Sequence, residues 1–197
     1  VADQVEKMLV ICPNSLKRNW VAEFEKFAPE ISVDVAEGTP RRRRATFRES
    51  SAAVIITSYE TARAETTSLL ALAQRQRTAL VLDESHAAKN WKSQTSAAAR
   101  TVAPHCQFRW LLSGTPVTNT ATDLFTQVEI IEPGQGALGS LEAFKARLED
   151  DPSASFAQPV IDRLVLRRTK EQCLDLPDKS FVDVRVELPA WLRRLYD

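Results

Sequence analysis

The sequence has no excess of charge of either sign. Its 26 lysines and arginines balance 26 aspartates and glutamates, so the formal net charge is zero. A protein without net charge has no global field that would attract a polyanion. Any surface that binds nucleic acid must therefore be a local basic patch.

Cysteine is also scarce. Cys12, Cys106 and Cys173 are odd in number, far apart and without metal-ligand spacing, and Cys12 lies inside an apolar run. Disulfide frameworks and cysteine-based zinc sites need closer and more regular sets. This pattern favours a reducing, cytosolic compartment.

Long hydrophobic segments are missing too. No apolar stretch approaches membrane-spanning length, and the start shows no signal-peptide pattern, so we expect no membrane partner. There is no internal repeat and no low-complexity tract. The 197 residues are 44% hydrophobic, enough for one full core. The first seven residues look like the end of a helix, so we expect a fragment of a longer protein.

One stretch organises the rest of the chain. The apolar run at 79–82 leads directly into Asp83, Glu84, Ser85 and His86. A short continuous apolar run predicts a strand buried on both faces, and open α/β sheets bind ligands beyond the carboxyl ends of their strands. A nucleoside triphosphatase places there one acid that holds magnesium and another that deprotonates water. The alternative is an acidic turn with His86 as a helix cap.

Strands and helices alternate along the chain. Strands are predicted at 8–12, 31–35, 52–57, 79–82 and 108–112. Helices are predicted after residues 14–15, at 69–74, at 93–102, from 120 to 131 and after residue 140. This alternation is typical of a wound α/β sheet, mostly parallel, with helices on both faces.

Two local predictions concern the first helix and a basic run. Asn14 and Ser15 are suited to cap the first helix, and its apolar stripe comprises Leu16, Trp20, Phe24 and Phe27. For Trp20 we favour core packing over a contact with DNA. The run at 41–44 is all arginine, and we favour a solvated helix start there over a phosphate contact.

Five blocks occur in the order of a known family. They are Val10-Ile11-Cys12-Pro13-Asn14-Ser15-Leu16 with Asn19-Trp20; Ile56-Thr57-Ser58-Tyr59-Glu60; Asp83-Glu84-Ser85-His86 with Lys89-Asn90; Leu112-Ser113-Gly114-Thr115-Pro116 with Asn119; and Leu166-Arg167-Arg168-Thr169-Lys170 with Leu176-Pro177 and Lys179. Together they resemble motifs Ia, Ib, II (a DEAH-like box) and III, and the interlobe segment, of the Swi/Snf-type DNA translocases in helicase superfamily two. The resemblance implies a RecA-like P-loop NTPase lobe at 1–187, with 188–197 beginning the connection to a second lobe.

One family feature is absent from the chain. No glycine is followed by lysine, so there is no G-x-x-x-x-G-K-[ST] phosphate loop. The resemblance places that loop before Val1. It implies that the longer protein uses ATP with Mg²⁺, and that this chain alone hydrolyses little ATP because the β- and γ-phosphates lack their cradle.

The resemblance also assigns catalytic roles. Asp83 is expected to contact Mg²⁺ through its water shell, and Glu84 to be the base that polarises the hydrolytic water. His86 is expected to sense the γ-phosphate and to act on Ser113 and Thr115, which couple hydrolysis to lobe movement. A tight turn that caps the next helix is an alternative role for 113–116, and both roles are compatible.

DNA contacts are expected on the phosphate backbone, independent of base sequence. The candidates are Pro13, Asn14, Ser15, Thr57, Ser58, Lys89 and Asn90. Hydroxyls and amides at helix starts suit phosphate oxygens. Arg167, Arg168 and Lys170 fit either an interlobe contact or a solvated segment.

The predicted function is a motor that moves on double-stranded DNA and remodels a DNA-bound protein, together with a second RecA-like lobe in cis. The alternative is a non-hydrolysing scaffold that binds DNA or protein. An RNA-directed helicase is disfavoured by Asn19-Trp20 and by the segment 166–170. The expected compartment is the cytoplasm (the nucleoid of a bacterium) or a eukaryotic nucleus.

Overall fold

The computed structural model describes residues 5–114, 121–168, 182, 189 and 193. The chain divides into two units, Val1–Leu164 and Val165–Asp197. The predicted domain boundary between residues 187 and 188 lies outside the described residues and stays a prediction. The fold described below is that of the first unit.

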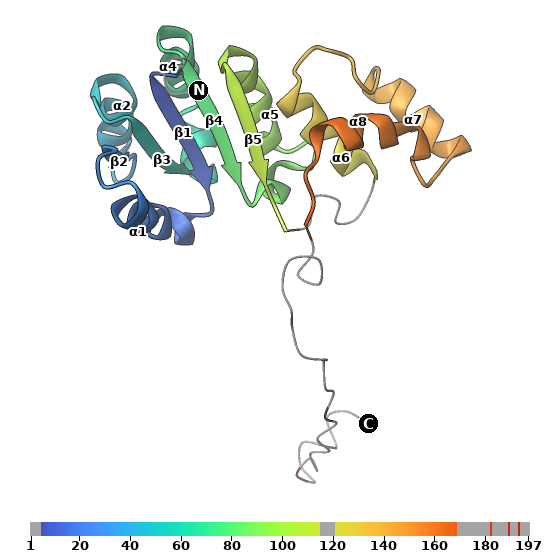
Figure 1. Ribbon diagram of the computed structural model, residues 1–197, viewed down its shortest axis with the longest axis horizontal. Coiled ribbons are helices and arrows are strands. Elements are labelled where there is room, and N and C mark those ends of the chain that lie inside the picture. Colours follow the sequence, from blue (N-terminus) through green and yellow to red (C-terminus); the bar gives the residue numbers. More distant parts are fainter. Residues whose placement is uncertain (1–4, 115–120, 169–181, 183–188, 190–192, 194–197) are drawn as a thin grey trace. The chain divides into compact units, whose positions relative to one another are not determined.

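A five-stranded parallel sheet forms the centre of this unit (Figure 1). Its strands are β1 (Lys7–Cys12), β2 (Val33–Val35), β3 (Val54–Ser58), β4 (Thr78–Asp83) and β5 (Phe108–Leu112), in the order β2-β3-β1-β4-β5. The three central strands are the continuous apolar runs of the sequence, as expected for strands covered on both faces. The prediction of an α/β lobe with a parallel sheet is confirmed.

Most helices cover one face of the sheet. They are α2 (Pro40–Glu49), α3 (Tyr59–Ala64), α4 (Thr66–Arg75), α5 (Gln94–Val102) and α6 (Ala121–Ile131). On this face Leu9, Ile55 and Leu80 pack with Phe47 from α2 and Leu72 from α4 in one buried cluster. Burial of these side chains is the main force that holds the layer on the sheet.

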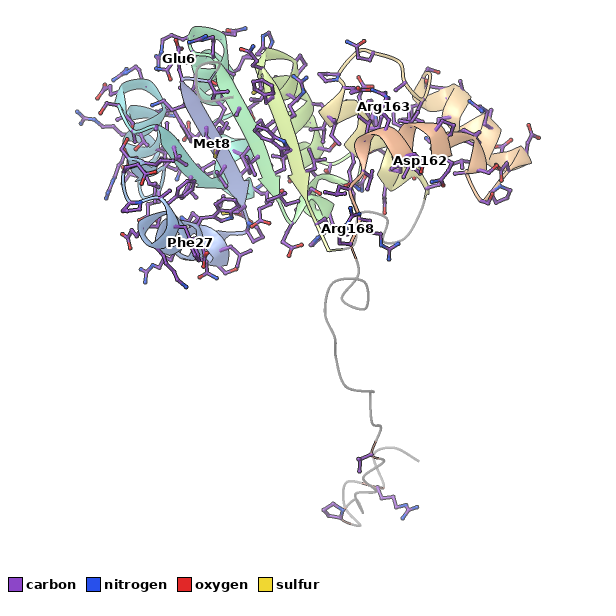
Figure 2. All side chains as sticks on the ribbon, in the orientation of Figure 1. Glu6, Met8, Phe27, Asp162, Arg163 and Arg168 are labelled. Atoms are coloured by element: carbon purple, nitrogen blue, oxygen red, sulfur yellow. The ribbon has the colours of Figure 1, made fainter. Side chains whose placement is uncertain are left out.

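Helix α1 (Lys17–Phe27) covers the opposite face of the sheet. Leu16, Trp20 and Phe24 pack against a buried cluster that includes Val10. The predicted apolar stripe is therefore confirmed for these three residues. It is wrong for Phe27, which is labelled in Figure 2 and is 70% exposed at the end of the helix.

The predicted cap of α1 is also wrong. Asn14 and Ser15 lie inside a short 3₁₀ turn, η2 (Asn14–Leu16), and neither side chain caps a helix. The turn is closed by a hydrogen bond of 2.9 Å from the Leu16 amide to the Pro13 carbonyl. Because the chain curls before α1 begins, the two polar side chains lie ahead of the helix and are exposed.

Two other helices begin where the sequence predicts them. The Ser93 hydroxyl accepts from the Ser96 amide at the start of α5, and the Ser140 hydroxyl accepts from the Ala143 amide at the start of α7 (Leu141–Asp150). Such a cap satisfies an amide that has no partner within the helix.

The arginine run begins α2, as predicted, but it is not wholly solvated. Arg43 and Arg44 lie 3.1 Å and 3.6 Å from the carboxylate of Glu65, which is only 5% exposed. This buried acid thus holds α2 next to the start of α4.

A second apolar cluster lies outside the sheet. It joins α6 and α7 to the turn η5 (Ser155–Ala157) and helix α8 (Gln158–Leu164), which the sequence analysis did not predict. Phe144 is fully buried between Phe125 and Phe156, with ring centroids 5.3 Å away on each side. These aromatic contacts fix the helices that follow motif III.

Strand β5 is less buried than its neighbours. Phe108 and Trp110 stack with ring centroids 5.8 Å apart, and Trp110 and Leu112 are 40% and 42% exposed.

Over the part of the chain that the structure describes, no helix combines the length and the hydrophobicity needed to cross a membrane.

Candidate active site

The carboxyl ends of four parallel strands meet at one edge of the sheet. The register pairs Cys12 with Ser58 and Asp83 with Leu112, and β1 lies between β3 and β4. This edge brings together Pro13, Asn14, Ser15, Thr57, Ser58, Asp83, Glu84, His86 and Ser113. It is the edge at which open α/β sheets bind their ligands.

Asp83, the last residue of β4, is held at three points. Its Oδ2 accepts a hydrogen bond of 2.8 Å from the indole N–H of Trp20, and its Oδ1 accepts one of 2.9 Å from the Glu84 amide. The phenol of Tyr59 donates to its backbone carbonyl at 2.8 Å. The carboxylate is half-buried and has a defined orientation.

The Tyr59 hydroxyl is a hydrogen-bond donor and not an anion. Burial, and next the negative charge of Asp83, raise the pKa of this phenol above its ordinary value. Burial likewise raises the pKa of the Cys12 thiol to about 11, with Asp83 adding to the effect. Both groups therefore stay protonated near neutral pH and supply no nucleophile.

Glu84 adopts a backbone conformation that is unusual for a residue other than glycine. Its φ and ψ are 50° and 51°, in the left-handed region. The turn η3 (Ser85–Ala88) follows directly, and it brings His86 Nδ1 to 3.2 Å from Glu84 Oε2. The Glu84 carboxylate thus lies next to an exposed imidazole, on a backbone conformation that is typical of functional sites.

Turn η3 is tied to α6. The buried hydroxyl of Ser85 donates to Gln127 Oε1 at 3.3 Å, and the Lys89 ammonium lies 3.4 Å from Asp123 Oδ2. Helix α6 follows residues 115–120, which lie outside the described part of the chain and include Thr115. The acidic turn is thus connected to the helix that follows motif III.

The residues predicted to bind DNA differ in how far their side chains are exposed. Asn14 and Ser15 are exposed, whereas Thr57 has no exposed surface and Ser58 is 3% exposed. The Thr57 hydroxyl donates to the Ala36 carbonyl, and the Ser58 hydroxyl caps α3. Contacts of these four residues with DNA stay predictions, and only the first pair has side chains at the surface.

Lys89 and Asn90 line a pocket of about 350 Å³. The other lining residues are Trp91, Lys92, Thr122, Asp123, Leu141 and Lys145. Three of the eight side chains are lysines and one is an aspartate, so the pocket has a surplus of positive charge. A local surplus of this kind attracts polyanions even though the formal net charge of the chain is zero.

The donor set at the strand end suits Mg²⁺. This ion prefers oxygen ligands, keeps several waters and is bound by one or two carboxylates together with substrate phosphates. Asp83 and Glu84 supply two half-buried carboxylates at one edge. Among the described residues, no group of three or more histidine, cysteine or acidic side chains forms a cage for a metal. The residues therefore fit an ion shared with a nucleotide.

Sequence reasoning missed three residues of this site. Trp20 and Tyr59 contact Asp83 from 63 and 24 positions away, and Gln127 contacts Ser85 across 42 positions. Trp20 and Tyr59 belong to the quoted motif blocks, but no local pattern identifies their hydrogen-bond partners.

Comparison with known proteins identifies the family of the chain. The profile of the SNF2-related domain matches residues 1–197. An uncharacterised ATP-dependent helicase of Mycoplasma genitalium is 30% identical over 96% of this chain, and the TATA-binding protein-associated factor MOT1 of Saccharomyces cerevisiae is 33% identical over 95% of it. The chain spans 18% and 11% of the lengths of these relatives.

A solved structure shares the fold. The Sulfolobus solfataricus SWI2/SNF2 ATPase core in complex with double-stranded DNA superimposes with a TM-score of 0.70 and 26% identity. The match covers 86% of this chain and 35% of that one.

Proposed function

Because this chain belongs to the SNF2-related domain family, we propose that it is the first RecA-like lobe of an ATP-dependent translocase on double-stranded DNA. The observation that carries the proposal is the pair Asp83 and Glu84 at the carboxyl end of β4, with the first held by Trp20 and the second paired with His86. A domain that only binds has no need of two acids aimed at this edge.

Asp83 and Glu84 have separate roles in the proposed mechanism. Asp83 would hold Mg²⁺, and this ion would supply charge neutralisation at the phosphates of ATP. Glu84 takes the proton of the attacking water, a role whose loss costs about 10²–10⁴ in rate. His86 lies at hydrogen-bonding distance from the Glu84 carboxylate and orients it.

The acidic turn communicates with motif III through α6. Ser85 and Lys89 contact Gln127 and Asp123 on that helix. A displacement of the turn on hydrolysis is therefore passed to the segment that contains Thr115, next to Ser113. In the proposed motor this segment moves the second lobe, which belongs to the same polypeptide.

The proposed DNA surface comprises Pro13, Asn14, Ser15, Lys89 and Asn90, together with the basic pocket. The side chains of all but Pro13 carry donors for phosphate oxygens, so binding is independent of base sequence and depends on salt. A DNA-bound protein is the proposed remodelling substrate. The proposed compartment follows the DNA: the bacterial cytoplasm or a nucleus.

The second candidate function is a scaffold that binds DNA or protein without hydrolysis. A degenerate phosphate loop in the longer protein would favour it. The two functions differ in turnover and not in DNA binding.

The deciding experiment measures ATP turnover by a longer protein that includes an upstream phosphate loop and a second lobe, with and without duplex DNA. Glu84→Gln is the test variant, and Glu142→Gln, an exposed acid on α7, is the matched control. The motor is supported if duplex DNA stimulates turnover, Glu84→Gln abolishes it and Glu142→Gln leaves it unchanged. DNA binding with no turnover by the unaltered protein selects the scaffold.

A further inference from the structure

Trp20 packs on the sheet and also reaches the acid at the end of β4. Its indole N–H donates to Asp83 Oδ2 at 2.8 Å across 63 positions of sequence. We propose that Trp20 is a positioning residue, whose N–H fixes the Asp83 carboxylate in the orientation that engages Mg²⁺. The inference rests on the proposed function, because it takes Asp83 as the acid that holds the ion.

The hydrogen bonds to Asp83 leave its carboxylate able to bind a further ligand. An ionised carboxylate has about four acceptor positions on its two oxygens. The indole of Trp20 uses one position on Oδ2, and the Glu84 amide uses one on Oδ1. Each oxygen therefore keeps a position for a water of the metal shell, while rotation about the Cβ–Cγ bond is blocked.

The indole itself is fixed by packing. Its ring lies 6.1 Å from the ring of Phe24 at an angle of 34°, and both rings pack against the buried cluster beneath α1. A packed tryptophan normally finds some acceptor for its N–H. Here that acceptor is charged, which makes the bond stronger than one to a neutral carbonyl.

Such a support has a measurable effect. Groups that orient a metal-binding side chain typically contribute about 10–100-fold to metal affinity or activity. A tryptophan that served only the core would instead affect the stability of α1 and leave the dependence on metal unchanged. The two roles are therefore separable in one variant.

The variant is Trp20→Phe, which keeps an aromatic ring and removes the N–H. The matched control is Trp110→Phe, because Trp110 stacks on Phe108 along β5 and lies outside the proposed site. In the longer protein, we expect Trp20→Phe to raise the Mg²⁺ concentration for half-maximal turnover by about 10-fold. The control keeps the wild-type value. The inference is overturned if the unaltered protein turns over ATP and Trp20→Phe needs the same Mg²⁺ concentration for half-maximal turnover.

A second variant covers the case in which phenylalanine unfolds α1. Incorporation of 3-benzothienylalanine at position 20 replaces the N–H by sulfur and keeps the bicyclic shape. The same rise in the required Mg²⁺ is expected, and a wild-type requirement overturns the inference. Absence of turnover in the unaltered protein would reject the proposed function, and this inference with it.

A spectroscopic measurement tests the contact without turnover. In the 197-residue chain labelled with ¹⁵N-tryptophan, the indole signal of Trp20 is expected to shift in Asp83→Asn, whereas the signal of Trp91 stays. In the longer protein with ATP, Mn²⁺ used in place of Mg²⁺ is expected to broaden the Trp20 signal in the wild type more than in Asp83→Asn. An indole signal that responds to neither change overturns the inference.

Discussion

The hydroxyl of Tyr59 donates a hydrogen bond of 2.8 Å to the backbone carbonyl of Asp83. The donor is the first residue of α3 and the acceptor is the last residue of β4, so the bond joins the start of this helix to the end of this strand at the active edge. The contact orders the backbone from which both acids project.

We therefore expect Tyr59→Phe to destabilise the fold by about 1 kcal/mol, the usual contribution of one hydrogen bond. Urea denaturation gives the change as a lower midpoint at constant slope. Thr101→Val is the control, because its hydroxyl bonds to the Ala97 carbonyl on an exposed helix turn. Equal midpoints for Tyr59→Phe and the wild type would show that the bond contributes nothing.

Because Glu84 has a left-handed conformation, we expect some substitutions at this position to abolish activity without lowering stability. A non-glycine residue in this region costs about 1–2 kcal/mol, and glycine adopts it without that cost. Glu84→Gly is expected to be at least as stable as the wild type and inactive in the longer protein. Glu84→Val is expected to be less stable than Glu84→Gly by about 1 kcal/mol or more, because a β-branched residue is least tolerant of this conformation. If thermal denaturation ranks the valine variant above the glycine variant, the conformation does not carry strain.

The buried thiols predict a loss of stability in alkaline solution. Burial raises the pKa of Cys12 from 9.0 to about 11 and that of Cys106 to about 12. Above pH 9 the unfolded chain loses these protons while the folded chain keeps them, so the free energy of unfolding falls as the pH rises.

The measurement compares the wild type with a Cys12→Ala, Cys106→Ala double variant at pH 7.5, 9 and 10.5 under reducing conditions. The wild type is expected to lose more stability over this range than the double variant. Burial lowers the pKa of Lys7, which acts in the opposite direction but equally in both proteins. Parallel curves would exclude the thiols as the cause.

Lys89 predicts the salt dependence of DNA binding. It lines the basic pocket, and loss of one phosphate contact lowers the slope of log affinity against log salt concentration by about one. Lys89→Gln is expected to show this lower slope for duplexes of any sequence. Lys26→Gln, on the exposed end of α1, is expected to keep the wild-type slope. Equal slopes for the two variants would place the phosphate contact elsewhere.

The sequence predicts those parts of the molecule that depend on local pattern. The runs that became β1, β3 and β4 are apolar without interruption, and this alone identifies buried parallel strands. The helix starts next to Ser93 and Ser140 are predicted to within one residue, because a helix start depends on residues within one turn.

Features that depend on distant partners could not be predicted from the sequence. The stripe on α1 correctly placed Trp20 on the sheet, but the acceptor of its N–H lies 63 positions away. Phe27 continues the same periodicity, yet the helix ends there and its ring stays 70% exposed. The spacing of apolar residues tells which face of a helix they occupy, but it does not tell which part of the protein covers that face.

The strained turn at Glu84 has a consequence for the order of events in the working protein. The conformation persists because the sheet and the contacts at Asp83 enforce it, so the acids are aimed before any ligand arrives. Binding then loses little conformational entropy at these residues. Conversely, a substitution that weakens the core should first appear as faster amide hydrogen exchange in this turn, at temperatures where the sheet itself is still protected.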